Sequence, residues 1–128
     1  MKYLAIVLLL VCACKKKKAE ETPGIPGGKG GSYNISIFPQ QGQAGVTGKV
    51  FIKYGTKTVP SSYSGYSDSS ATMVEPGFGP HAHFFALKAG FYAIAAYGTR
   101  NGHFLKNDTL LEIKEGQKPS VDYILQLR

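Results

Sequence analysis

From Ser32 to the end of the chain, apolar and polar residues tend to alternate with a period of two. The alternation is clearest in the segments 33–37, 46–54 and 121–127. Stretches rich in glycine and polar residues, which interrupt strands, separate these segments. Successive side chains of a strand point to opposite faces of a sheet, so these segments predict strands with one buried and one wet face. No stretch of ten or more residues after residue 31 repeats its apolar residues every 3.6 positions. This part of the chain is therefore predicted to fold from strands rather than helices.

The strongest pair of predicted strands is His81–Leu87 and Phe91–Tyr97, joined by a turn that contains Gly90. The second of them is apolar on both faces, which is typical of a central strand. We also expect a short strand at Ala71–Val74 and a polar loop at Gly98–Asp108. Six or seven strands at this spacing predict an all-β fold, a single antiparallel β-sandwich of about seven strands.

The N-terminus carries a ten-residue apolar run, Leu4–Ala13, after a single lysine. Ten helical residues span about 15 Å, half of the roughly 30 Å hydrocarbon core of a bilayer. The run therefore predicts a cleaved signal peptide and not a membrane-spanning helix.

The four residues Val11-Cys12-Ala13-Cys14 resemble the lipobox of bacterial lipoproteins. The resemblance implies cleavage after Ala13 and a diacylglycerol on the Cys14 thiol, so that acyl chains (palmitate among them) hold the protein on a membrane. An ordinary secretory signal with incidental cysteines is the alternative. We expect a signal peptide at 1–13, the lipidated cysteine and a flexible tether at 14–31, and the sandwich at 32–128.

The positive charge of the chain is concentrated ahead of the predicted sandwich. The chain has 15 lysines and arginines against 8 aspartates and glutamates, but Lys2 and Lys15–Lys18 account for five of the basic residues. From Ala19 onward, the sequence contains 10 basic and 8 acidic residues. A nucleic-acid site needs cationic density on the folded surface, so no nucleic-acid partner is expected.

Two segments resemble the carboxypeptidase regulatory-like domains, which have a prealbumin-like (transthyretin-like) sandwich. They are Phe85-x-Leu87-x-x-Gly90-x-Tyr92 and Val121-Asp122-Tyr123-x-Leu125. The resemblance implies an immunoglobulin-like sandwich without catalytic activity, in which Gly90 permits the turn between two strands. It also implies that the ring of Tyr92 is buried while its hydroxyl reaches a polar edge.

One enzyme group with this fold, the hydroxyisourate hydrolases, uses two histidines, an arginine and a C-terminal Tyr-Arg-Gly-Ser. His81, His103 and Arg100 supply the residue types here, but the sequence ends in Leu-Gln-Leu-Arg. No catalytic residue is therefore carried over, and we do not expect an enzyme; a hydrolase of this type remains the least favoured alternative.

His81-x-His83 is the pair with metal-ligand character. On a strand, residues i and i+2 lie on one face about 6.5 to 7 Å apart, so two imidazoles can converge on one ion. Zinc requires a third protein ligand, for which the candidates are His103 and Glu75, and a copper site would add Met73. The alternative is two exposed histidines at a strand start, with no cofactor and no metal.

A serine- and tyrosine-rich loop, residues 61–70, has the composition of a binding loop, in which Tyr63 and Tyr66 would contact a protein or a glycan. A solvated connection is the alternative. Phe51 falls on the predicted wet face of its strand and would mark an interface. The leading hypothesis is a lipid-anchored, non-catalytic binding or accessory module of the bacterial envelope, at the outer membrane, with a metal-binding protein as the runner-up.

Overall fold

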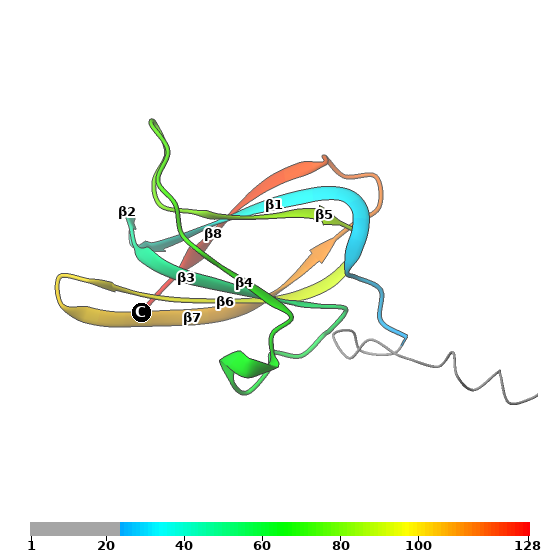
Figure 1. Ribbon diagram of the computed structural model, residues 1–128, viewed down its shortest axis with the longest axis horizontal. Helices are drawn as coiled ribbons and strands as arrows, with labels where there is room; N and C mark the ends of the chain where they lie inside the picture. The colour runs from blue at the N-terminus through cyan, green and yellow to red at the C-terminus, as the bar shows by residue number, and fades with distance from the viewer. Residues whose placement is uncertain (1–23) are drawn as a thin grey trace, which may run out of the picture.

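The computed structural model describes residues 24–128, which form two four-stranded β-sheets (Figure 1). In the sheet that we call the β1 sheet, β1 lies between β8 on one edge and β5 with the short β2 on the other. Its strands are β1 (Lys29–Gln41), β2 (Ala44–Gly45), β5 (Ala82–Leu87) and β8 (Ser120–Gln126).

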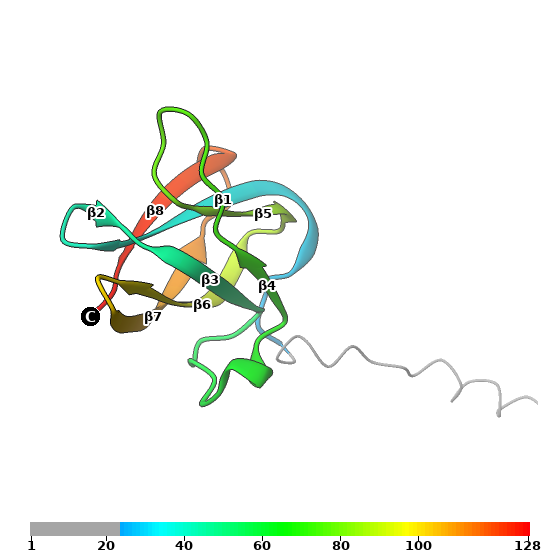
Figure 2. The same cartoon turned by 60° about the vertical axis from the view of Figure 1, so that its left-hand side comes forward.

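The second sheet, which we call the β3 sheet, has the strand order β4-β3-β6-β7. Its strands are β4 (Asp68–Ala71), β3 (Thr47–Tyr54), β6 (Gly90–Arg100) and β7 (His103–Ile113). A 3-10 turn, η1 (Tyr63–Gly65), lies on the far side of this sheet from the β1 sheet (Figures 1 and 2). The predicted β-sandwich is confirmed, with eight strands where about seven were expected.

The inner faces of both sheets form one apolar core, because the residues of each alternating strand that point inward meet across the sandwich. β6 is central in its sheet, as its apolar character predicted, and Tyr92 and Ile94 on it are fully buried. They pack with Ile35 and Ile37 of β1 and with Ile52 of β3. One pairing, β1 with β8, is parallel, whereas the other pairings among the described strands are antiparallel.

The prediction of a polar loop at Gly98–Asp108 is wrong. β6 and β7 continue through it and pair up to Arg100 and His103, leaving a turn of two residues. Asn101 and Gly102 both have positive φ, 53° and 79°, which matches the twist of a tight hairpin. The segment is polar because β7 is an edge strand whose outer face is exposed to solvent, and this polarity is the reason that the prediction failed. The strand expected at Ala71–Val74 is likewise displaced to Asp68–Ala71.

The packed part of the chain begins earlier than residue 32, inside the segment expected to be a tether. β1 starts at Lys29, and ahead of it Pro26 O accepts a hydrogen bond from Phe91 N at 2.9 Å. The hydroxyl of the buried Tyr92 lies 2.9 Å from Gly28 N, the polar edge that the resemblance implied. A Cβ on Gly90 would collide with the Pro26 carbonyl oxygen, so this glycine permits the close approach of the N-terminal segment.

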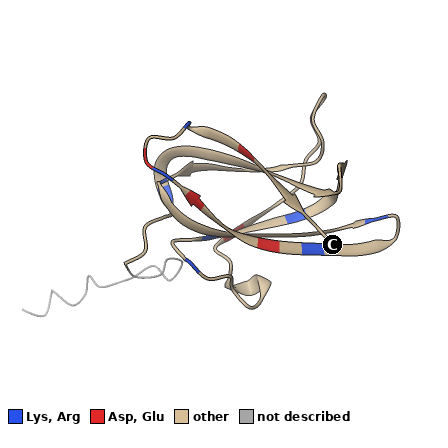
Figure 3. Cartoon of the chain, turned by 180° about the vertical axis from the view of Figure 1, so that it is seen from behind, with Lys and Arg blue, Asp and Glu red and all other residues tan. Residues whose placement is uncertain are grey.

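The signal peptide, Cys14 and most of the expected tether lie outside the described residues. Within residues 24–128 no helix has the length and apolar character needed to cross a bilayer. Basic and acidic positions are scattered over the strands and turns of this part of the chain (Figure 3).

Candidate metal centre

The start of β5 places two histidines on the outer face of the β1 sheet. His81 and His83 flank Ala82, which is fully buried in the core, so the two imidazoles point away from it. The backbone of His81 exchanges hydrogen bonds of 2.8 and 3.0 Å with Met73, which holds the incoming chain against the strand. The loop between them, residues 74–80, folds back and carries Glu75 to the same place.

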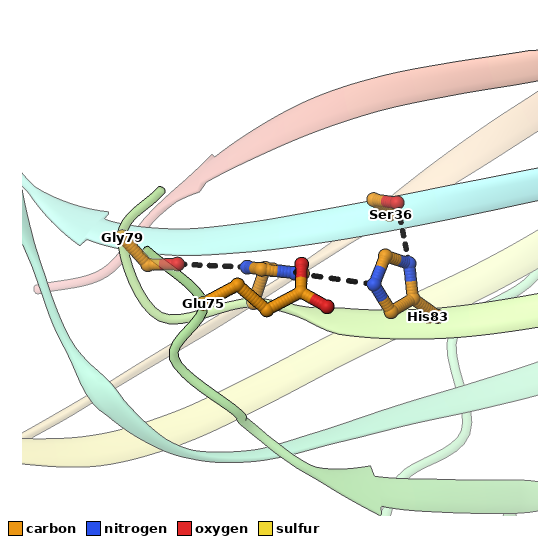
Figure 4. Close-up of polar contacts among 5 residues, drawn as sticks. Ser36, Glu75, Gly79 and His83 are labelled. Carbon is orange, nitrogen blue, oxygen red and sulfur yellow. Dashed lines mark hydrogen bonds and ion pairs between the residues drawn. The ribbon is translucent and has the colours of Figure 1, made fainter. Parts of the chain in front are cut away.

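Three ligand atoms converge there, one each from Glu75, His81 and His83 (Figure 4). The Nε2 atoms of the two histidines lie 3.1 Å apart, and His81 Nε2 lies 3.1 Å from Glu75 Oε1. All three atoms fall within 4.8 Å of one another. In a tetrahedral zinc site with bonds of about 2.0 to 2.1 Å, neighbouring ligand atoms are about 3.3 Å apart. Both 3.1 Å separations are close to this value, so these ligand atoms suit a first-row transition-metal ion.

The other ring nitrogens are held by hydrogen bonds that orient the imidazoles. His81 Nδ1 lies 2.7 Å from Gly79 O, and because a carbonyl only accepts, this nitrogen donates. His83 Nδ1 lies 2.8 Å from Ser36 Oγ on β1. Metal-binding histidines commonly use their second nitrogen in this way, which turns the Nε2 lone pair toward the metal.

With Nδ1 protonated, a neutral His81 presents a lone pair to the Glu75 carboxylate and to His83 Nε2. His83 Nε2 can donate to this lone pair at 3.1 Å when Ser36 Oγ donates to His83 Nδ1, and a metal ion can take the place of that hydrogen. The carboxylate of Glu75, 3.1 Å from His81 Nε2, adds negative charge beside the two imidazoles and so favours a cation among the three side chains. A metal ion that binds there competes with protons for the ligand atoms.

Aromatic side chains cover the inner part of the cluster and leave one side open. The His81 side chain is 2% exposed, and its ring stacks on Phe38 of β1 with a centroid distance of 4.8 Å. Phe78 of the loop approaches it edge-on at 6.2 Å. Glu75 is 47% exposed, so an ion can enter from its side. Burial of the His81 imidazole limits competing water and strengthens the attraction between the carboxylate and a bound cation.

Sequence reasoning named His81, His83 and both candidates for a third ligand, and the structure distinguishes between those candidates. Glu75 joins the pair, whereas His103 lies at the β6–β7 hairpin opposite Arg100 in the other sheet. The contribution of Ser36 and of the Gly79 carbonyl was missed. No sequence signal identifies them, because each reaches its histidine only through strand pairing or loop geometry.

The two tyrosines predicted to form a binding loop lie on the outer face of the β3 sheet. Tyr63 stacks on Phe51 at 4.7 Å, and Tyr66 lies 5.8 Å from the same ring. Phe51 is therefore only 8% exposed, and the expectation that it lies on a wet surface is wrong. Its side chain does point away from the core, but the loop carrying η1 folds over it.

Comparison of the chain with protein-family models, with curated proteins and with solved structures found no match.

Proposed function

We propose that the chain is a non-catalytic metal-binding lipoprotein that captures zinc or copper through Glu75, His81 and His83. The observation that supports this function best is the convergence of the two Nε2 atoms and one carboxylate oxygen within 4.8 Å. His81 Nδ1 donates to Gly79 O, so a neutral His81 has its lone pair on Nε2, and His83 has one there when its Nδ1 donates to Ser36 Oγ. Three protein ligands leave one position of a tetrahedral site for water or for a transfer partner.

The donor set favours zinc and copper over magnesium and calcium. Imidazole nitrogen is a ligand of intermediate softness, whereas magnesium and calcium prefer shells made of oxygen alone. The exposed carboxylate of Glu75 supports reversible loading, since it is the ligand that can move aside without opening the core. Such a site suits capture and release rather than permanent storage.

Calorimetric titration of the full chain, purified in detergent, with zinc chloride and with copper chloride tests the site. We expect one ion per chain for at least one of the two metals. His81→Ala, His83→Ala and Glu75→Gln should each lower that affinity about tenfold or more, because each removes a ligand. The two titrations also decide between the metals.

His103→Ala is the matched control, since it removes an exposed histidine outside the cluster. It should bind the ion as the unmodified chain does. Unchanged uptake by His81→Ala, with the β-sheet circular dichroism preserved, would refute the proposed site, as would the absence of uptake of either metal.

The location of the protein is part of the same proposal. The lipobox resemblance of residues 11–14 and the lysines that follow support attachment to the bacterial envelope through Cys14, with the outer membrane as the expected site. Metabolic labelling with a palmitate analogue should be lost in Cys14→Ser and retained in Cys12→Ser. Labelling that persists in Cys14→Ser contradicts the anchor.

A further inference from the structure

The outer face of the β3 sheet, on the opposite side of the sandwich from the metal centre, carries a second built site. Three residues stand in one row across its strands: Phe51 on β3 pairs with Ala95 on β6, which pairs with Asp108 on β7. Their side chains share a face because directly paired residues point the same way. A small residue between an aromatic ring and a carboxylate leaves a hollow over the middle strand.

The loop carrying η1 makes one wall of this hollow and the edge of the sheet makes the other. The hollow has a volume of about 360 Å³, within the range of small-molecule sites. Ala95 lines it, together with Tyr63 and Tyr66 from the loop and with Lys106, Asp108 and Arg128 from the far edge. The backbones of Lys106 and Arg128 exchange hydrogen bonds of 3.2 and 3.1 Å, which fixes this edge.

The tyrosine wall is rigid. Tyr63 is clamped by Phe51, with which it stacks at 4.7 Å, and by Tyr97, which it meets edge-on at 5.2 Å. It remains 38% exposed, so part of the residue is available to a ligand. Preorganised aromatic contact area costs little entropy on binding.

The polar groups around the hollow are both donors and acceptors. Burial, and then the negative charge of Asp108, raise the pKa of Tyr66 to about 12, and burial also raises the pKa of Tyr63. Both phenols therefore keep their protons at neutral pH and can donate hydrogen bonds. Asp108 accepts, and Lys106 and Arg128 on the same rim donate.

This combination of donors and acceptors favours one ligand class over several others. A purely apolar molecule would gain no hydrogen bond from the carboxylate and the two cations that line the hollow. A phosphate dianion lacks a hydrogen-bond donor for Asp108, and an organic ammonium ion lacks an acceptor for Lys106 and Arg128. A sugar ring satisfies every group, because its C–H face carries slight positive charge toward an aromatic ring, while its hydroxyls both donate and accept.

The geometry points to a saccharide-binding site, in which a sugar ring packs against Tyr63 and Tyr66 over Ala95 and hydrogen-bonds to Asp108. This site shares no residue with the metal centre. It gives the lipoprotein a second, independent ligand.

The test uses the full chain in detergent and three oligosaccharides: cellotetraose, chitotetraose and tetragalacturonate, which are neutral, N-acetylated and acidic. We expect saturable binding of at least one of them in calorimetry. Ala95→Leu fills the hollow and should weaken that binding about tenfold or more, as should Asp108→Asn. Tyr66→Phe keeps the ring and should give a smaller loss.

Glu112→Gln is the control for Asp108→Asn, because it neutralises another carboxylate of β7 that does not line the hollow. It should leave binding unchanged, as should His81→Ala, which separates this site from the metal centre. If none of the three oligosaccharides binds, the proposal is overturned. It is also overturned if binding survives both Ala95→Leu and Asp108→Asn; should Ala95→Leu fail to fold, Asp108→Asn alone decides.

Discussion

The outer faces of the two sheets are each covered in part by a loop that folds back onto the sheet, but the side chains on the two faces differ in their chemistry. On each face a residue that points away from the core is covered by a loop that folds back: His81 on the β1 sheet, 1% exposed, and Phe51 on the β3 sheet, 8% exposed. Residues 74–80 cover the first, and the loop carrying η1 covers the second. The first face brings three metal-ligating side chains together, and the second packs Tyr63 and Tyr66 around Phe51.

The two covered residues differ in what their burial requires. Phe51 gains stability simply by losing contact with water. His81 has two polar nitrogens, and burying them is tolerable only because Gly79, Glu75 and His83 supply partners. Covering an apolar residue thus builds structure, whereas covering a polar one forces the neighbouring groups to converge, and this convergence creates the site.

The largest expected effect concerns the aromatic face. Phe51→Ala removes a ring that is stacked under Tyr63 and should lower the free energy of unfolding by about 3 kcal/mol, the lower end for a buried phenylalanine. Phe104→Ala, at a ring that is 59% exposed, should change it by only about 0.5 kcal/mol. Urea denaturation measures both. Equal losses of unfolding free energy in the two variants would mean that the Phe51 side chain is exposed to solvent, as the alternation along its strand suggests.

The metal face should respond to a ligand that does not act on the aromatic face. At a free zinc or copper concentration of about 100 times the dissociation constant, the bound ion adds about 2.7 kcal/mol to the free energy of unfolding. Thermal denaturation with and without the ion should show this gain in Phe51→Ala and not in His81→Ala. A gain in His81→Ala would place the ion elsewhere.

A smaller effect is expected from the hydroxyl that orients His83. Ser36→Ala leaves all three ligands in place but removes the partner of His83 Nδ1, so metal affinity should fall about tenfold, or about 1.4 kcal/mol. Ser69→Ala, on β4 of the other sheet, is the control and should bind the ion normally. Calorimetric affinities that are equal for the two variants would show that Ser36 does not position the ring.

The smallest expected effect is a loss of folding stability at alkaline pH. The pKa of Tyr66 is raised from 10.0 to about 12, so the unfolded chain loses this proton first. The stabilisation associated with the neutral phenol is complete below about pH 10 and is lost as the pH rises toward about 12. Urea denaturation across this range should show a shallower decline for Tyr66→Phe. Tyrosinate absorbance should show a lower Tyr66 pKa in Asp108→Asn, because the charge of Asp108, the second largest of the three causes of the shift, is removed.

Much of the architecture is readable from the alternation of apolar residues. Ile35, Ile37 and Ile52 are predicted to point inward and do so, and the doubly apolar strand around Ile94 is central in its sheet. The loop expected at Gly98–Asp108 fails because polarity on an edge strand is indistinguishable from polarity in a loop. The parallel pairing of β1 with β8 also has no local signal, since it joins segments far apart in the chain.

The candidate site was readable in part. The His81-x-His83 spacing predicts two imidazoles on one face, and Glu75 was one of two candidates for a third ligand. Choosing between Glu75 and His103 required the path of residues 74–80, which the Met73–His81 backbone bridge sets.

The order of residues in the chain is sufficient to establish which side chains face the core and which face away from it, because the pleat of a strand imposes that choice locally. Whether an outward-facing side chain meets water depends on where a later loop folds, and the packing of distant segments determines that. For this reason the sequence predicts which face of its sheet each of Phe51 and His81 lies on, but not whether the side chain is buried or exposed there. Both sites that we propose lie where such loops return to the sheets.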